Sequence, residues 1–336
     1  MDKQRVSVAM CTYNGARHIQ EQLDSIAAQT RLPDELVVCD DISSDSTIEI
    51  IKSFMSKVSF PVRLYVNEEN LDPRKNREKT ISLCTGDIIV LSDWDDVWKP
   101  DKIEKILEVF AENLEAGYVF SNAELVDESL IPLGDTLWKA RGFNSFLEEY
   151  SHPDEQVRIL LKQNLVWGAT LAFRSSLKNI VLPISPFYYM EDAWIALLAS
   201  CAGFYGIPLS DSLLYYRQHP TQLAGGTNTL SQKFKRAQNP KDTEFFKIMV
   251  QGLLDAKNRL FLMQNTLDKD ISLELNLIQE KADHFSKRVF IRSSRNLISK
   301  VKAMAPEILT SKYHRFSNSW QSVAKDVLFW TNNNLK

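Results

Sequence analysis

The sequence predicts an α/β protein with a mainly parallel sheet covered by helices on both faces, followed by a helical C-terminal region. Short apolar runs alternate with helical periodicity through the first hundred residues, a pattern typical of strand–helix–strand units. Small polar and acidic side chains follow several of these runs. After residue 230 glycine almost vanishes and helical spacing takes over. We therefore expect a sheet domain over residues 1–229 and a helical region over 230–336.

The strands and helices are expected where apolar residues repeat with the matching period. Strands are predicted over residues 6–11, 36–39, 62–66, 88–91, 118–121, 165–173 and 213–219. Helices are predicted over 19–26, 48–55, 77–84, 103–110 and 194–201, and through the C-terminal region. Ser46 and Glu49 have the spacing of a capping box at the start of the second helix. The stretch 127–164 is expected to be an irregular, aromatic-rich loop over a ligand crevice.

The composition is that of an ordinary globular protein and excludes several classes. The 336 residues are 44% hydrophobic and 25% charged, with a formal net charge of -3, so a uniformly basic polyanion-binding protein is excluded. No apolar run reaches 18 residues and the start lacks the apolar stretch of a secretion signal, so we expect a cytoplasmic protein. The four cysteines are far apart, and we expect them to be reduced.

Polar residues follow three of the predicted strands, at 12–14, 40–41 and 92–96. Parallel sheets bind ligands beyond the carboxyl ends of their strands, so these residues are expected to line one crevice. Asp93, Asp95 and Asp96 would repel one another there unless a cation intervened. Carboxylate oxygens suit Mg²⁺ or Mn²⁺. The alternative is a solvated acidic turn before a helix.

Five segments, taken together, resemble the inverting family 2 glycosyltransferases, which have the GT-A fold with a mixed sheet. The segments are VSVAMCTYN at 6–14, ELVVCDDISSD at 35–45, SDWDDVW at 92–98, YMEDAW at 189–194 and YYRQH at 215–219, followed by Gly225. The last is similar to a motif of members that build bacterial surface polysaccharides, many of them rhamnosyltransferases. The segments occur in the family's order and span about two thirds of the chain.

The resemblance implies how a nucleotide sugar is bound. Its nucleoside would contact Thr12, Tyr13, Asn14 and Asp41, and a carboxylate at Asp41 could accept the N3–H of uracil or thymine. The alternative is that Asp40 or Asp41 caps the next helix. The resemblance also assigns residues to the base, the phosphates and the metal: Arg74, Asn76 and Asp93 to the nucleotide, Arg217 to the diphosphate, and Asp95, Asp96 and His219 to Mn²⁺ or Mg²⁺. Around Arg74 the sequence departs from the usual glycine-containing version.

The resemblance further implies that Asp192 is the catalytic base that deprotonates the acceptor hydroxyl. Glu191, Trp167 and Gly168 would then lie near the acceptor sugar. One base without a second nucleophile implies a single displacement with inversion. Alternatively, Glu191 and Asp192 are first-turn acids of a helix, Trp167 is a core residue, and His219 is a polar surface residue. The assignment requires Asp95 and Asp192 to face a shared cavity.

The region 281–315 carries nine Lys or Arg and two acids among spaced apolar residues. This pattern suggests an amphipathic basic helix that could lie on anionic lipid at the inner face of the cell membrane. The alternative is a helix packed on the catalytic domain or on a second subunit of a homodimer.

The expected function is therefore metal-assisted transfer of a sugar from a UDP- or dTDP-sugar to a saccharide or lipid-linked saccharide. Two rivals remain. A nucleotidyltransferase would ordinarily have a Gly-rich loop after the first strand, whereas Gly15 is the only glycine there. An inactive nucleotide-sugar-binding scaffold would have less need to keep Asp93, Asp95 and Asp192 together. No aromatic and basic module indicates nucleic-acid binding.

Overall fold

The computed structural model describes residues 4–219, 241–294 and 296–333. Its strands are β1 (Val6–Thr12), β2 (Glu35–Asp40), β3 (Val62–Val66), β4 (Ile88–Ser92), β5 (Val97–Trp98), β6 (Ala116–Val126), β7 (Pro132–Thr136), β8 (Leu171–Arg174) and β9 (Tyr205–Arg217). The helices of the sheet domain are α1 (Ile19–Ala27), α2 (Thr47–Met55), α3 (Pro73–Leu83), α4 (Lys102–Glu112), α5 (Leu137–Arg141), α6 (Leu147–Tyr150), α7 (Pro153–Lys162), α8 (Lys178–Val181) and α9 (Glu191–Cys201). The C-terminal helices are α11 (Lys241–Met263), α12 (Ser272–Ser293), α13 (Leu297–Leu309), α14 (Lys312–Phe316) and α15 (Ser319–Asn333).

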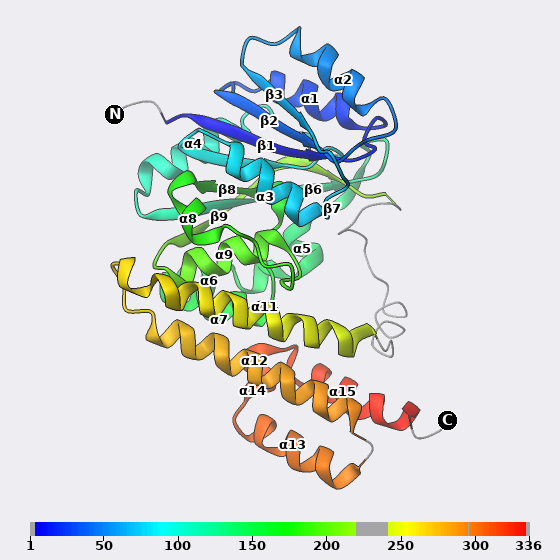
Figure 1. The fold of residues 1–336 in the computed structure, drawn as a ribbon, viewed down its shortest axis with the longest axis vertical. Coiled ribbons are helices and arrows are strands. Elements are labelled where there is room, and N and C mark those ends of the chain that lie inside the picture. The colour runs from blue at the N-terminus through cyan, green and yellow to red at the C-terminus, as the bar shows by residue number, and fades with distance from the viewer. Residues whose placement is uncertain (1–3, 220–240, 295, 334–336) are drawn as a thin grey trace.

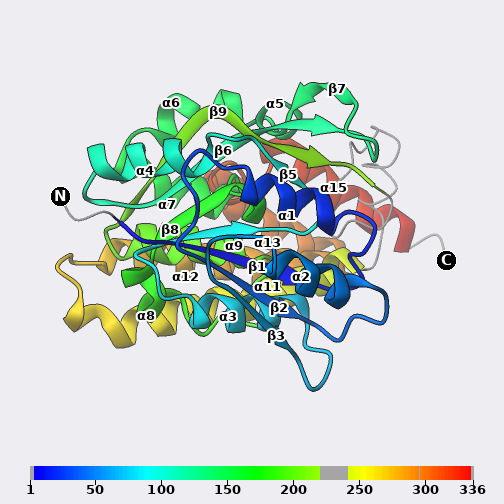
Figure 2. The same ribbon diagram turned by 90° about the horizontal axis from the view of Figure 1, so that it is seen from above.

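The strands form one mixed sheet in the order β3-β2-β1-β4-β8-β6-β9-β5, with β7 added to β6. The first four strands in this order are parallel, as the strand–helix alternation predicts. β8 then runs antiparallel to both β4 and β6, and β6 is parallel to β9. β3 and β9 lie toward opposite margins of the sheet (Figure 2). The sheet is therefore mixed, as the GT-A resemblance implies, rather than mainly parallel, because β8 in the middle of the sheet runs antiparallel to both of its neighbours.

Helices cover both faces of the sheet. Figure 1 shows α1 and α2 on one side, with α9 and α11 on the other, and α12 beyond them. Because both faces are covered, β2 and β4 are buried along their whole length, which explains their continuous apolar runs. α9 is likewise buried from Asp192 to its end at Cys201.

The stretch 127–164 is not the irregular loop that the sequence predicts. It contains β7 and the helices α5, α6 and α7. Trp138, Phe143 and Tyr150 are buried around Phe120 of β6, with ring centroids 5.3 to 5.9 Å from that ring. The aromatic residues of this stretch thus complete the core beside β6 instead of forming a flap.

Asp45, rather than Ser46, caps the second helix, α2. Asp45 Oδ1 accepts from the backbone N–H of Thr47 at 3.1 Å, whereas Ser46 makes no side-chain cap hydrogen bond. The predicted capping box of Ser46 and Glu49 is therefore wrong. So is the alternative in which one of the two aspartates after β2 caps this helix.

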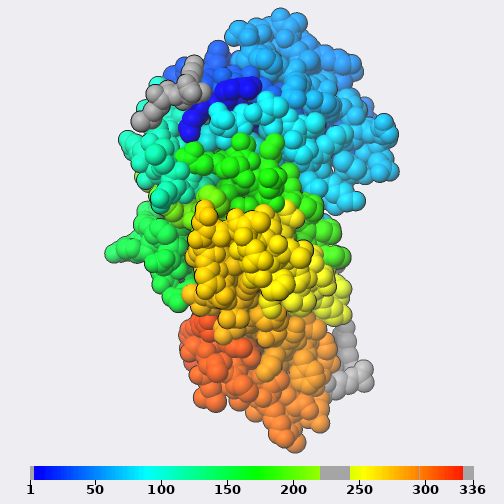
Figure 3. All heavy atoms as spheres, turned by 60° about the vertical axis from the view of Figure 1, so that its left-hand side comes forward, coloured from blue at the N-terminus to red at the C-terminus, as the bar shows by residue number. Residues whose placement is uncertain are grey.

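The C-terminal helices form the lower end of the molecule (Figures 1 and 3). The carboxylate of Asp326 on α15 is buried and accepts from Arg288 and Arg292 of α12, at 2.6 to 3.0 Å. Lys281, also buried, donates to the Leu161 carbonyl of α7. The predicted single basic amphipathic helix is therefore wrong, because several of its charges face inward and tie the helices together.

Two predictions fall outside the described residues: the domain boundary between 229 and 230, and Gly225. No helix in the described part of the chain is both long enough and apolar enough to span a membrane.

Candidate functional site

The predicted strand ends meet at one edge of the sheet. β2, β1 and β4 are parallel neighbours, so Asp40, Thr12 and Ser92, which end them, lie side by side. The loops that follow carry residues 13–14, 41 and 93–96 to the same edge. This confirms the expectation that these separate strand ends meet at one edge of the sheet.

The loop after β1 is held by hydrogen bonds to the loop after β2. Thr12 Oγ1 donates to Asp40 Oδ2 at 2.7 Å. Asn14 has a positive φ of 48°, a conformation that asparagine tolerates better than most residues, and its Oδ1 accepts from the Ser44 N–H at 2.9 Å. Tyr13 between them is 50% exposed. Thr12 and Asn14 thus hold the loop and leave the Tyr13 ring at the surface.

Asp41 is oriented by two hydrogen bonds that end on the same oxygen. Its Oδ1 accepts from Asn67 Nδ2 and from the Leu71 N–H, both at 2.7 Å. Asn67 is held in turn by Asn76, whose Oδ1 accepts from it at 3.0 Å. Asn76 also donates to the Cys39 carbonyl at 3.0 Å. These partners favour a role for Asn76 in positioning Asp41 over direct contact with a nucleotide.

The unusual sequence around Arg74 begins a helix. Asp72 caps α3 by accepting from the Arg74 N–H at 2.8 Å, and Pro73 occupies the first helical position. Arg74 Nη1 donates to the carbonyls of Pro186 and Tyr188 at 2.6 and 2.9 Å. Arg74 therefore ties α3 to the loop that precedes α9, which favours a positioning role for this side chain as well.

The aspartates after β4 have distinct partners. Asp95 Oδ2 lies 2.8 Å from His219 Nε2. Asp96 Oδ1 accepts from the backbone N–H of Arg217 at 3.1 Å, while its Oδ2 is buried without a hydrogen-bond partner among the described residues. Burial and the charges of Asp95 and Asp93 raise the pKa of Asp96 well above its usual range. The three carboxyl groups thus lie close enough together for each to disfavour the charged form of its neighbours, as the acid cluster predicts.

Arg217 does not present its guanidinium to the crevice as predicted. The side chain is buried, and its Nε donates to the Asp95 carbonyl at 2.7 Å and its Nη2 to Glu21 at 2.5 Å. Its Nη1 donates to the Glu128 carbonyl. Because all three nitrogens have protein partners, we correct its assignment from diphosphate ligand to support of the Asp95 loop.

Three rings gather around the Asp95 loop, and one of them, His18, was not identified from the sequence. The His18 ring lies 5.6 Å from that of His219 and 6.3 Å from that of Trp94, between centroids. Gly15 approaches Trp94 so closely that a Cβ there would lie 2.9 Å from the indole ring. The loop after β1 and the loop after β4 therefore pack directly on each other.

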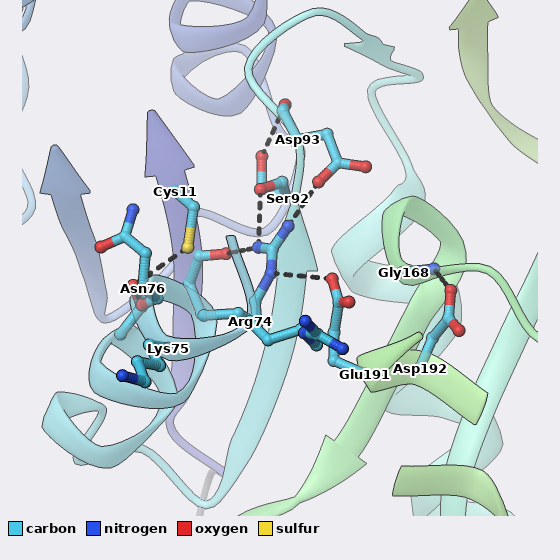
Figure 4. A network of polar contacts seen from close by, with 12 residues as sticks. Cys11, Arg74, Lys75, Asn76, Ser92, Asp93, Gly168, Glu191 and Asp192 are labelled. Atoms are coloured by element: carbon cyan, nitrogen blue, oxygen red, sulfur yellow. Dashed lines mark hydrogen bonds and ion pairs between the residues drawn. The ribbon is translucent and has the colours of Figure 1, made fainter. Parts of the chain in front are cut away.

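Arg77, which the sequence analysis did not identify as a site residue, joins the two halves of the site. It is buried in α3, and its Nη1 donates to the carbonyls of Ala9 and Ser92 at 3.2 and 3.1 Å. Its Nη2 donates to Asp93 Oδ1 at 2.5 Å, and its Nε lies 3.6 Å from Glu191 Oε1. Figure 4 shows Asp93 and Glu191 on either side of this network. The segment containing the candidate base thus lies beside the loop after β4.

Asp192 is buried and surrounded by donors. Its Oδ2 accepts from the Gly168 N–H at 2.8 Å (Figure 4). Its Oδ1 accepts from Asn164 Nδ2 at 3.2 Å and from the Ala193 N–H at 2.5 Å. Burial raises the pKa of Asp192 to about 8 and the Glu191 charge acts in the same direction, against the hydrogen bonds that it accepts. A carboxyl with this pKa is a strong proton acceptor once ionised.

The remaining predicted acceptor residues adjoin these acids. A Cβ on Gly168 would lie 3.8 Å from Asp192 Oδ2 and 4.0 Å from Glu191 Oε1, so Gly168 lies beside both carboxylates. Trp167 is largely buried, which favours its core alternative. Glu191 and Asp192 are the first two residues of α9, so they are first-turn acids as well as members of the site.

The residues present fit a divalent cation held partly by its substrate. No three His, Cys, Asp or Glu side chains of the described chain converge as a complete metal cage. Asp95 Oδ2 and His219 Nε2, however, are 2.8 Å apart, close to the separation of about 3 Å between adjacent ligands of an octahedral ion. Two protein ligands are enough for an ion that completes its shell with phosphate oxygens and water.

The chain is similar to several known proteins. The glucosyltransferase WfgD of Escherichia coli, named for transfer from UDP-Glc to α-D-GlcNAc-diphosphoundecaprenol, is 27% identical over 202 residues, 59% of this chain and 71% of that protein. The structure of S. aureus TarS 1-349 with UDP-GlcNAc has a TM-score of 0.55 at 18% identity, covering 97% of this chain and 89% of that one. The mannosyltransferase PcManGT of Pyrobaculum calidifontis, solved with GDP-Man and Mn²⁺, has a TM-score of 0.56 at 18% identity, covering 99% and 87%.

The structural likenesses establish the fold. Alignments to two other curated glycosyltransferases span only 65% and 36% of the lengths of those proteins. Residues 7–173 match the family model described as Glycosyl transferase family 2. This match contains the strand ends, Arg77 and the aspartate cluster, and it ends just after Gly168. Through these residues the chain belongs to glycosyltransferase family 2, with the GT-A fold.

Proposed function

We propose that the protein transfers a sugar from a nucleotide diphosphate sugar to a hydroxyl group of a saccharide, with inversion at the anomeric carbon. The observation that carries this proposal is the placement of Arg77 between Asp93 and Glu191. It supports a single site that contains both the aspartate cluster and Asp192, the neighbour of Glu191, as a single displacement requires.

The donor is a UDP- or dTDP-sugar, with rhamnose among the candidates. The named relatives use UDP-Glc, UDP-GlcNAc or GDP-Man, so rhamnose rests on the sequence motif alone. The acceptor is a growing, lipid-linked cell-surface polysaccharide, in keeping with the lipid diphosphate acceptor in the name of WfgD.

The donor half of the site binds the nucleotide. Asp41, oriented through its Oδ1, accepts the N3–H of the base, and the exposed Tyr13 ring contacts the nucleoside. Asp93 faces the ribose and diphosphate. Asp95 and His219 would hold Mn²⁺ or Mg²⁺, which when bound neutralises the charge that develops on the departing nucleoside diphosphate. Asp96 holds this loop in place by accepting a hydrogen bond from the backbone N–H of Arg217.

The acceptor half of the site activates the nucleophile. Asp192 takes the proton from the acceptor hydroxyl as the hydroxyl oxygen bonds to the anomeric carbon and the bond from that carbon to the diphosphate breaks. The Gly168 N–H fixes Oδ2, and Asn164 and Ala193 fix Oδ1, so the carboxylate keeps one orientation. We assign one base and no covalent nucleophile, and the stereochemistry is therefore inverted.

The test of this function is a nucleotide-release assay. The full-length protein is incubated with UDP-, dTDP- and GDP-sugars and a lipid-linked saccharide, in Mn²⁺ and in EDTA. We expect release of nucleoside diphosphate with one or a few donors, dependent on the acceptor and abolished by EDTA. Release of nucleoside monophosphate or pyrophosphate would instead indicate a nucleotidyltransferase, and binding without turnover would indicate a scaffold.

Transfer should also depend on pH with a sign set by Asp192. The base works only when ionised, so kcat/KM is expected to rise with pH and reach half its plateau near the Asp192 pKa of about 8. The Glu191 charge is one of the causes that raise this pKa. Glu191→Gln should therefore move the half-maximal point to lower pH, by roughly one unit.

The control for this profile is Glu108→Gln, which removes an exposed charge from α4 and should leave the profile in place. A half-maximal point that stays fixed or rises in Glu191→Gln would show that another group controls the rate.

A further inference from the structure

Helix α13 has charged residues on its inner face and apolar residues on its outer face, the reverse of an ordinary surface helix. Its inner face carries charged side chains, since Lys300 and Glu307 are buried beside Met304. Its outer face is aliphatic and includes Ile298 and Leu309, which are 66% and 83% exposed. Helices on protein surfaces normally place their charges outward and their apolar side chains inward.

The exposed aliphatic residues form one continuous stripe. Ile298, Val301, Ala305 and Leu309 are three or four residues apart, and this spacing puts them on one side of a helix. We call these four residues the α13 ridge. Lys302 lies within the same side and is exposed. A contiguous apolar patch of this kind on a soluble surface marks an interaction site.

The exposed charge on α13 is positive, because its one acid, Glu307, is buried and Lys302 is exposed. Between positions 284 and 327 the sequence contains two acids, Glu307 and Asp326, and both are buried. Glu307 Oε2 lies 2.6 Å from His284 Nδ1, with which it forms a hydrogen bond. Asp326 pairs with the arginines of α12. Lys302 is exposed, whereas Lys287 of α12 lies 3.7 Å from Glu307 Oε1 and pairs with it. The surface near the ridge is thus complementary to anions.

The position of α13 leaves the ridge accessible. The helix packs on α12 and α14 and lies at the end of the molecule opposite α1 and α2 (Figure 1). The C-terminal helices form that end in the space-filling view as well (Figure 3). A flat surface can therefore approach the ridge without meeting the sheet domain.

We propose that the α13 ridge inserts into the interface of an anionic lipid membrane, with Lys302 at the lipid phosphates. Aliphatic side chains and flanking basic residues together are the combination that holds peripheral helices on membranes. This inference deepens the proposed function and rests on it for its purpose, because a lipid-linked acceptor lies at such a surface. The basic side chains of α12 were expected to contact the membrane, but several of them bind other helices. The proposed contact is instead made by the apolar side of α13.

The test is co-sedimentation of the full-length protein with vesicles of phosphatidylcholine containing 30% phosphatidylglycerol, and with phosphatidylcholine alone. We expect clear binding to the anionic vesicles and weak binding to the neutral ones. The double variant Ile298→Ser and Leu309→Ser should lose at least tenfold in partition coefficient. Both side chains are exposed, so the melting temperature should stay within a few degrees of wild type.

A matched control removes exposed aliphatic side chains elsewhere. Leu114→Ser with Ile131→Ser changes residues of similar exposure in the sheet domain and should bind vesicles as wild type does. Lys302→Glu should lower binding to anionic vesicles and leave binding to neutral ones unchanged. Equal vesicle binding by the ridge and control variants would overturn the proposal.

Two further results separate this inference from its alternatives. If sedimentation velocity without lipid shows a dimer that the ridge variant dissociates, and vesicle binding is unaffected, the ridge is a subunit interface and the membrane proposal fails. Transfer to a soluble saccharide should be the same in wild type and ridge variant. Vesicle binding without any sugar transfer would keep the membrane contact and reject the enzymatic function instead.

Discussion

Asp192→Asn is expected to slow sugar transfer by about 10³-fold to 10⁴-fold while nucleotide binding stays at the wild-type level. General base catalysis contributes this order of acceleration. The amide has the shape of the carboxylate, and its oxygen can still accept from the Gly168 N–H, although its NH2 group cannot accept from Asn164 and Ala193 as Oδ1 does. These lost bonds lie in the acceptor half of the site, away from the nucleotide. An amide cannot take up the proton of the acceptor hydroxyl, so only the chemical step is lost.

The measurement compares initial rates of transfer with the dissociation constant of the nucleoside diphosphate from calorimetry. Asp154→Asn makes the same chemical change at an exposed position of α7 and should leave both quantities unchanged. An undiminished rate in Asp192→Asn would remove Asp192 as the base. A parallel loss of nucleotide binding would mean that the substitution disturbs the whole site.

Asp95→Ala is expected to weaken binding of the donor about 100-fold or more in the presence of Mn²⁺, and to change it little in EDTA. The proposal gives the cation two protein ligands, and removing the carboxylate leaves His219 alone. The charge on the diphosphate would then lack the cation that compensates it, which opposes binding. Transfer should fall at least as far as binding, because the leaving group also loses its stabilisation.

Calorimetric titration of the nucleoside diphosphate, with Mn²⁺ and with EDTA, measures this effect. Asp101→Ala removes an acid at the start of α4 that pairs with Lys105, and this variant should bind donor normally. If Mn²⁺ enhances binding to Asp95→Ala as much as to wild type, the cation lies elsewhere or is not required.

The sequence was sufficient to predict the parallel half of the fold and the convergence of strand ends, because both follow from local periodicity. It also gave the neighbours Asp95 and His219, but only through the resemblance to a family, since the two residues are 124 positions apart. Arg77 and Asn164 were missed for the same physical reason. Their importance comes from partners that distant segments bring to them, and neither belongs to a motif.

The errors also have physical causes. Arg217 was expected to bind phosphate because guanidinium does so readily, yet carbonyl and carboxylate groups of the protein use the same donors. The aromatic residues of 127–164 gave no clear period because short helices place them against β6 from several directions. On the C-terminal helices, the Lys and Arg side chains were expected to be exposed because they are charged. Burial of Lys300 and Arg288 depends on α15 and on other elements that local patterns do not reveal.

The shared position of Arg77 implies that the two substrates affect each other's affinity. One guanidinium neutralises Asp93 on one side and lies near Glu191 on the other, so a ligand that changes the charge at either carboxylate changes the field at both. Such coupling is reciprocal at equilibrium: if the nucleotide strengthens the hold on the acceptor, the acceptor must strengthen the hold on the nucleotide by the same factor. With coupling of that sign the ternary complex is favoured over either binary one.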